Sequence, residues 1–231
     1  KELIDKLSEV CSLSREEWIE LISGRTPELA DYLFKKAQNV RIQHYGHDVY
    51  VRGLIEFSNY CKNDCYYCGI RKSNSNAVRY RLTKEEILEC CQLGYEIGYR
   101  TFVLQGGEDG WFTTERMADI VSSIHSRWPD CAITLSIGEL SKESYQMLYD
   151  AGAERYLLRH ETYDAEHYRM LHPASLSAQH RQQCLWDLKE IGYQVGTGFM
   201  VGAPYQTVEN LADDLLFLKK LNPHMVGIGP F

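Results

Sequence analysis

Three cysteines lie close together in the chain, at Cys61, Cys65 and Cys68. Their spacing is C-x3-C-x2-C, and they follow an apolar, β-branched run from Val49 to Phe57. That run predicts a strand, so the cysteines are expected in the loop that leaves it. A structural zinc ion needs four ligands, whereas a four-iron cluster takes one protein ligand at each iron. Three local cysteines therefore indicate a cluster with one iron left open to bind a substrate or cofactor.

A zinc site is the main alternative. Cys65 and Cys68 form a C-x2-C pair, which is often a zinc or redox motif, and His44 or His47 could supply a fourth ligand from upstream. A disulfide framework is not expected, because nothing else in the chain is typical of a secreted protein. A non-catalytic scaffold that carries zinc or a cluster therefore stays open beside an enzyme.

The remaining cysteines show no spacing typical of ligands. They are Cys11, Cys90, Cys91, Cys131 and Cys184. Free buried cysteine behaves as a small apolar residue, and we interpret most of these five in that way. A second cluster remains an alternative, and Cys131, in a predicted strand, is the candidate ligand for it.

The composition excludes some classes of partner. The 231 residues include 25 Lys and Arg against 32 Asp and Glu, a net charge of −7, so no basic stripe is available to neutralise nucleic-acid phosphates. No apolar run is long enough to span a membrane, and the N-terminus lacks a signal-peptide core. We expect no nucleic-acid or membrane partner and a cytoplasmic location.

Helices are predicted for the first part of the chain. Ser14 to Glu17 form a capping box, and Thr26-Pro27 begins the next helix with Thr at the N-cap. Residues 1–46 are therefore predicted to be an N-terminal helical cap. Residues 47–231 are predicted to be a separate core domain that carries the chemistry.

Strands and helices alternate in that core. The predicted strands are 49–57, 100–105, 132–136, 155–158, 194–200 and 225–228, and the predicted helices are 83–97, 115–126, 141–151, 165–171, 177–191 and 207–221. Gly98, Gly152 and Gly192 follow helices and suit a left-handed helix end. This alternation predicts an α/β fold with parallel strands and right-handed crossovers. An eight-unit barrel typically needs about 250 residues, so we predict a partial TIM-type barrel of about six units, either an open crescent or the first part of a complete barrel.

The strand ends carry the polar residues. In parallel α/β folds ligands bind at the carboxyl ends of the strands. Five such ends are polar or rich in glycine: the cysteine loop, Gln105 to Asp109, Thr134 to Ser136, Arg159 to Thr162, and Gly196 to Gly202. The sequence therefore predicts one site that gathers these segments.

Longer motifs around the cysteines resemble a known family. The string C-x3-C-x-φ-C, with Tyr67 as the aromatic φ residue, is similar to the signature of the radical S-adenosylmethionine (SAM) superfamily. Glu56 to Cys61, Cys68 to Ser73 and Leu104 to Asp109 resemble, within it, the HydE family of [FeFe]-hydrogenase maturases. The resemblance covers most of the chain after about residue 45. It implies a complete (βα)8 barrel, so we expect the last two units to be missing here.

The resemblance also implies the chemistry. Cys61, Cys65 and Cys68 would hold a [4Fe–4S] cluster, and SAM would bind its open iron and be cleaved reductively to a 5′-deoxyadenosyl radical. The implied substrate is a small organometallic molecule, a cysteine-bound iron carbonyl–cyanide precursor of the hydrogenase diiron subcluster. Other hydrogenase maturases and an electron donor are possible partners. Methylornithine synthase and biotin synthase are alternatives within the superfamily.

Five residues at two strand ends are assigned to SAM. Gly106, Gly107 and Glu108 match the family motif that holds the SAM amino group, although a glycine pair by itself is equally typical of a plain turn. Gln105 and Ser136, at the ends of their strands, are assigned to the same cofactor.

The remaining SAM contacts come from later segments. Glu161 matches the family position that binds the ribose hydroxyls; a salt bridge to Arg159 is the alternative. Arg181 matches the position that pairs with the SAM carboxylate, although alone it would be interpreted as a solvated helix residue. Met200 lies in a segment, Gly198 to Gly202, that resembles the adenine motif, but Tyr205 stands where a glutamate is common. Tyr67 is therefore expected along the adenine.

Two further groups complete the sequence predictions. Arg159, Thr134 and Met225 are expected to face the barrel interior and contact the substrate. The histidines of the second half, His160, His167, His172 and His180, are expected at the surface or at helix ends rather than as metal ligands.

Overall fold

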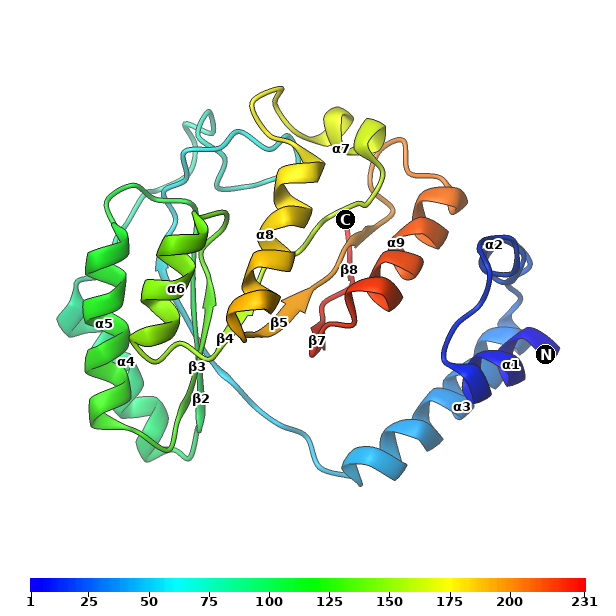
Figure 1. Cartoon of the computed structure of the whole chain (residues 1–231), viewed down its shortest axis with the longest axis horizontal. Helices are drawn as coiled ribbons and strands as arrows, with labels where there is room; N and C mark the ends of the chain where they lie inside the picture. The colour runs from blue at the N-terminus through cyan, green and yellow to red at the C-terminus, as the bar shows by residue number, and fades with distance from the viewer.

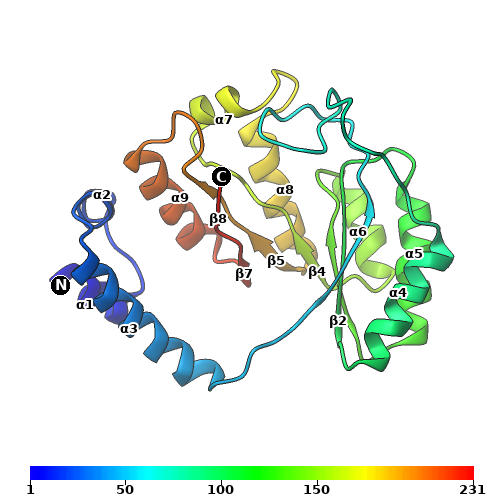
Figure 2. The same cartoon turned by 180° about the vertical axis from the view of Figure 1, so that it is seen from behind.

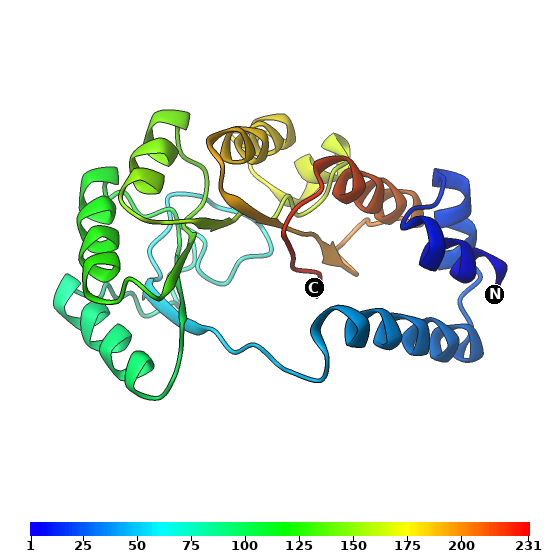
Figure 3. The ribbon, with the colours of Figure 1, turned by 60° about the horizontal axis from the view of Figure 1, so that its bottom comes forward.

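The computed structural model describes residues 1–231, and its centre is one open sheet of six parallel strands. Their order along the sheet is their order along the chain: β1 (Gly53–Ser58), β2 (Thr101–Gly106), β3 (Ala132–Ser136), β4 (Arg155–Leu157), β5 (Gln194–Thr197) and β7 (Met225–Val226). The sheet is curved and does not close, since β1 and β7 are both edge strands (Figure 3). The predicted partial TIM-type barrel of six parallel strands is confirmed.

Helices cover the convex face of the sheet (Figure 1). They are α4 (Lys84–Glu96), α5 (Thr114–Arg127), α6 (Lys142–Asp150), α8 (Ala178–Ile191) and α9 (Val208–Leu221), whereas α7 (Ala165–Leu171) lies beside the cysteine loop, where the Tyr66 amide donates to the Leu171 carbonyl oxygen. Thr83, Ser141 and Ser177, where three predicted helices begin, are N-caps that accept hydrogen bonds from the first helical turn. Gly98, Gly152 and Gly192 have φ of 101°, 113° and 112°, as the predicted left-handed helix ends require.

The two faces of the sheet differ in polarity because side chains alternate along each strand. Phe102, Leu104 and Leu135 point to the helices and are buried in the main apolar core. Their strand neighbours Gln105 and Ser136 lie opposite each other in the ladder and point to the concave face. The concave face therefore presents polar groups.

Two predicted strands have different bounds in the structure. Residues 49–52 are not part of β1, and Val49 is 79% exposed. The predicted strand 194–200 is split into β5 and β6 (Met200–Val201), which pairs with β8 (Gly229–Pro230) in a second small sheet. Gly198 lies at the break, where a Cβ would be 1.8 Å from the carbonyl oxygen of Gly227. This close approach of two backbones ends the regular ladder.

The N-terminal residues form α1 (Glu2–Val10), α2 (Arg15–Ser23) and α3 (Pro27–Tyr45). The capping box at Ser14 and the N-cap at Thr26 are formed as predicted. Helix α2 packs against α9, and α3 leads into an extended segment that reaches β1 (Figure 2). None of the helices combines the length and apolar character that crossing a bilayer requires.

Candidate cofactor site

A cavity of about 530 Å³ lies at the carboxyl ends of the strands. Most of the predicted site residues line it: Cys61, Cys65, Tyr67, Cys68, Gln105, Gly106, Gly107, Glu108, Ser136, Arg159, Glu161 and Arg181. The structure thus brings together residues from the ends of β2 and β3, from the loops after β1, β2 and β4, and from α8. Thr134, Met200 and Met225 are the three predicted residues that do not line this cavity.

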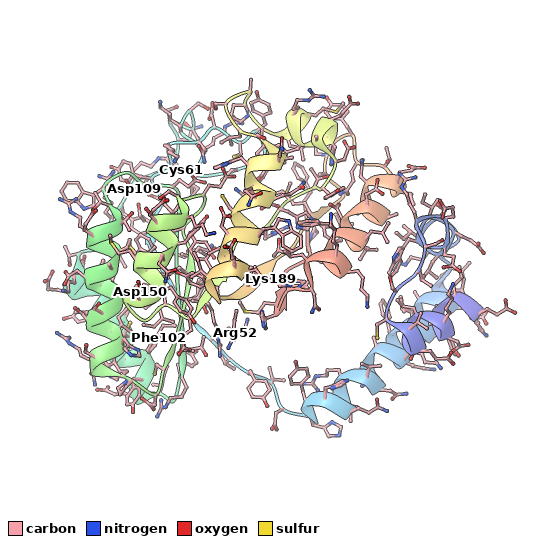
Figure 4. All side chains as sticks on the ribbon, viewed as in Figure 1. Arg52, Cys61, Phe102, Asp109, Asp150 and Lys189 are labelled. Carbon is pink, nitrogen blue, oxygen red and sulfur yellow. The ribbon has the colours of Figure 1, made fainter.

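The cysteine loop is held in shape by Arg79. Its guanidinium donates hydrogen bonds to the carbonyl oxygens of Asn59, Ile70, Arg71 and Asn74, on both sides of the cysteines. One side chain therefore fixes where the loop begins and ends. Figure 4 shows Cys61 and Asp109 at the same end of the sheet, opposite Phe102.

The three thiols fit a cluster by their chemistry and their placement. All three are free and partly buried around the cavity. Burial raises the pKa of the Cys65 thiol to about 12 and also raises that of Cys61, so binding a metal centre would release protons. No three His, Cys, Asp or Glu side chains are arranged around a point as ligands of one ion. Each cysteine of a cubane binds a different iron, so these ligands need not meet at one point.

Gly107 brings the second motif against the first. A Cβ at this position would be 2.2 Å from the carbonyl oxygen of Tyr60 and 2.8 Å from the Cβ of Cys61. The amide of Lys62 donates to the carbonyl oxygen of Glu108 at 2.9 Å. Glycine is therefore needed for the backbone contact between the loops after β1 and β2, and the glycine pair is more than a plain turn.

The Glu108 side chain is held by protein groups. Its carboxylate lies 3.1 Å from the Lys62 ammonium and accepts a hydrogen bond of 3.1 Å from the amide of Glu139. Gly138, with φ of 86°, leaves the space for this carboxylate, since a Cβ there would be 2.1 Å from its Cγ. Lys62 and Glu139 were not among the predicted site residues.

Asp109 joins the same two loops through its carboxylate. Its carboxylate accepts two hydrogen bonds from Arg81, at 2.6 and 2.9 Å, one from the Ser58 hydroxyl at 2.6 Å and one from the amide of Trp111. Burial acts to raise the pKa of Asp109, but these donors outweigh burial and lower it. The ionised carboxylate is therefore a structural part of the site.

Glu161 lines the cavity and has one buried carboxylate oxygen without a hydrogen bond. Its backbone has φ of 66°, in the left-handed region that a non-glycine residue seldom adopts. The residue is 8% exposed, and its Oε2 has no hydrogen-bond partner in the protein. The Arg159 guanidinium lies 3.5 Å from this oxygen, so the alternative ion pair is present but leaves acceptor capacity that a hydroxyl group could use.

Arg181 is held at the cavity wall rather than in solvent. Its side chain is 15% exposed; Nε donates to the carbonyl oxygen of Arg159 at 2.5 Å, and Nη1 donates to the Glu139 carboxylate at 2.8 Å. Nη2 has no protein partner and can donate to a bound carboxylate.

Tyr67 belongs to an aromatic cluster with α7. Its hydroxyl is 3.0 Å from Nε2 of His172, and the His172 ring stacks on Tyr168 with centroids 3.7 Å apart. His172 donates through Nδ1 to the carbonyl oxygen of Tyr168, so Nε2 accepts from the Tyr67 hydroxyl. Met200 packs with Leu171 behind Tyr67, which places it outside the cavity.

The prediction for the histidines was wrong for His160 and His167, whereas His172 lies at a helix end as predicted, as the C-cap of α7. His160, His167 and His172 are buried, and each uses both ring nitrogens in contacts with protein groups. His180 is exposed as expected. The local sequence around these residues does not indicate hydrogen-bond partners that are distant in the sequence.

The other two substrate candidates lie on the concave face of the sheet. Thr134 is buried on β3, and its hydroxyl has no hydrogen-bond partner. Met225 pairs with Gly196 at the β7 edge. Arg159 alone among the three candidates lines the cavity.

A parallel α/β fold with three cysteines at its ligand-binding end defines the class of this protein. The chain belongs to the Radical SAM superfamily, whose sequence profile matches residues 55–218. It is 45% identical over 231 residues to the [FeFe] hydrogenase maturase subunit HydE of Thermotoga maritima, a match that covers 100% of this chain and 65% of that protein.

Methylornithine synthases are also similar. The 3-methylornithine synthase of Methanosarcina acetivorans is 30% identical over 229 residues, which are 98% of this chain and 64% of that protein. The crystal structure of methylornithine synthase (PylB) matches with a TM-score of 0.90 at 30% identity, over 99% of this chain and 67% of that one. The chain therefore spans about two thirds of the length of these relatives. The predicted superfamily is confirmed, and the identity to HydE exceeds that to methylornithine synthase.

Proposed function

We propose that this protein is a radical SAM enzyme of the HydE type, an [FeFe]-hydrogenase maturase that acts in assembly of the diiron subcluster. The observation that carries the proposal is the single cavity that gathers three free cysteines, the Gly106–Glu108 motif, Glu161 and Arg181. The identity of 45% to HydE supports the particular activity.

Cys61, Cys65 and Cys68 would hold a [4Fe–4S] cluster, and the cavity beside them would hold SAM. Together, cluster and SAM supply one-electron cleavage of the sulfonium carbon–sulfur bond, giving a 5′-deoxyadenosyl radical that attacks the substrate.

The chain would orient SAM through groups that have unused hydrogen-bonding capacity. The Nη2 donor of Arg181 suits the methionine carboxylate, and the free Oε2 of Glu161 suits a ribose hydroxyl. The backbone at Gly106 and Gly107, with the Glu108 carboxylate, suits the amino group. Tyr67 is held by His172 where its ring can cover the adenine.

The substrate would lie on the concave face of the sheet. Arg159 lines the cavity, and its Nε and the Thr134 hydroxyl are buried donors that no protein group uses. With Met225 they are the proposed contacts to a small organometallic iron–cysteine substrate. The proposal includes other hydrogenase maturases and an electron donor as partners, and a cytoplasmic location.

Three other functions are alternatives to this one. Methylornithine synthase shares the fold at 30% identity, and biotin synthase is a further relative. A scaffold with zinc at the cysteines is the alternative without catalysis.

The test is anaerobic reconstitution with iron and sulfide, metal analysis, and EPR of the reduced protein with and without SAM. We expect iron and sulfide in cluster stoichiometry, a [4Fe–4S]⁺ signal that changes on adding SAM, and no such signal in Cys65→Ala. Stoichiometric zinc, or a cluster signal indifferent to SAM, would contradict the proposal. Activation of an immature [FeFe]-hydrogenase by the other maturases only when this protein is added would separate the HydE activity from the alternatives within the superfamily.

A further inference from the structure

The turn after β4 carries two cavity residues on either side of a buried histidine. Arg159 and Glu161 line the cavity. His160 between them points the opposite way and is 1% exposed. Its ring packs edge-on against Phe217 of α9, with centroids 4.9 Å apart. The His160 ring therefore packs on the side of the turn that faces away from the cavity.

Asp214 of α9 holds both ends of this turn. Its Oδ1 lies 3.2 Å from Nε2 of His160 and accepts a hydrogen bond of 2.6 Å from the amide of Tyr163. The side chains of Asp214 and His160 are both completely buried. A buried carboxylate requires such donors, so Asp214 binds the turn at two points.

Thr197 of β5 completes the anchor of His160. Its hydroxyl oxygen lies 3.0 Å from Nδ1 of His160 and accepts a hydrogen bond of 3.3 Å from the amide of the same residue. The Thr197 hydroxyl donates to Nδ1, and the Nε2–H of His160 donates to Asp214. The ring is therefore fixed from two elements, β5 and α9.

The anchor acts where the backbone is strained. Glu161 directly follows His160 and has φ of 66°. Such a conformation in a non-glycine residue persists only when its surroundings enforce it. We propose that Asp214 and Thr197 act through His160 as positioning residues, which hold Glu161 in the left-handed conformation that keeps its side chain at the cavity wall. This proposal rests on the proposed function, since its ligand is SAM.

The experiment measures the Kd for SAM by EPR titration of reconstituted protein at equal cluster content. We expect Asp214→Ala to weaken binding about tenfold, because Glu161 can relax from its strained backbone. Thr197→Val, which keeps the shape of the side chain, should weaken it by a smaller factor. Asp214→Asn keeps an acceptor at Oδ1 and should bind nearly as well as wild type. Leu221→Ala, a fully buried residue of the same helix, is the control for lost stability and should leave Kd unchanged.

A double-variant cycle separates positioning from general destabilisation. In a Glu161→Gln background, Asp214→Ala should lower Tm as before but change the Kd for SAM little further. The inference is overturned if Asp214→Ala and Thr197→Val both keep wild-type affinity, if Leu221→Ala weakens binding as much, or if the effect is the same in the Glu161→Gln background. Wild-type protein that binds a cluster but no SAM would instead contradict the proposed function.

Discussion

At the scale of single residues, Gly107 determines whether the cysteine loop and the loop after β2 can touch. The carbonyl oxygen of Tyr60 would be 2.2 Å from a Cβ at this position, a distance that requires a backbone to move. Gly107 thus lies next to Cys61 in space, although the two residues are far apart in the sequence. Its lack of a side chain is a condition for the site, independent of any contact it makes with a ligand.

Gly107→Ala should therefore displace Cys61 and impair cluster assembly. We expect iron and sulfide per chain after reconstitution to fall below about half of the wild-type value, since sites misplaced by about 1 Å bind poorly. Gly69→Ala is the matched control in the cysteine loop, because nothing lies within 4 Å of a Cβ there. Equal cluster content in the two variants would contradict this reading of Gly107.

His172 should make stability depend on pH. Burial lowers the pKa of His172 from 6.5 to about 4. Its contribution to stability is therefore fully present above pH 6.5, where the His172 imidazole is neutral in both the folded and the unfolded chain. The contribution is lost as the pH falls toward 4. We expect up to about 3 kcal/mol of unfolding free energy to be lost from this residue in that window. Imidazole NMR shifts and urea unfolding check it, with His172→Gln as reference; an imidazole that titrates near pH 6.5 would refute it.

At the scale of elements, Asp109 joins the ends of β1 and β2. Its carboxylate is 3% exposed and receives donors from both loops, whereas that of Asp119, paired with Lys84 between α4 and α5, is 64% exposed. Removing the charge of a buried carboxylate lowers the free energy of unfolding more than removing that of an exposed one, because only the buried carboxylate leaves unpaired donors behind.

Asp109→Asn should lower the free energy of unfolding by about 3 kcal/mol, because it leaves Arg81 without its counter-ion. Asp119→Asn should cost less than about 0.5 kcal/mol, as exposed pairs do. Urea unfolding at pH 7 compares the two. Similar losses in both variants would mean that the buried carboxylate does not join the loops in the way its hydrogen bonds indicate.

The elements themselves were predictable because their signals are local. Thr83, Ser141 and the helix-ending glycines act within a few residues of their own position, and the strand ends then placed the cavity. The contact of Glu139 with Arg181 joins residues 42 positions apart, and no local sequence pattern indicates it. The same holds for Asp214 and His160, 54 positions apart. Sequence reasoning thus found most of the groups that line the cavity but missed the groups that hold them.

At the scale of the whole molecule, the N-terminal helices attach to the crescent through α2 and α9. Arg15 of α2 donates two hydrogen bonds, at 2.7 and 3.0 Å, to the carboxylate of Asp213. Asp213 lies next to Asp214, which holds the turn after β4. Helix α9 therefore contacts the N-terminal helices on one face and the candidate site on the other. The division into a cap of residues 1–46 and a core of residues 47–231 stays a prediction, which this contact makes testable.

Arg15→Glu should loosen the N-terminal helices without unfolding the crescent. Like charges would then face each other across α2 and α9, and we expect amide hydrogen exchange in α2 to speed up about fivefold, the scale of one exposed ion pair. Exchange in β2 and β3 should stay unchanged, because their core lies between the sheet and other helices. The reversed pair, Arg15→Glu with Asp213→Arg, should restore protection in α2, which excludes a simple loss of helix propensity. Faster exchange throughout the sheet would mean instead that residues 1–46 and the crescent form one cooperative unit, and that the predicted boundary at residue 46 is not a boundary in stability.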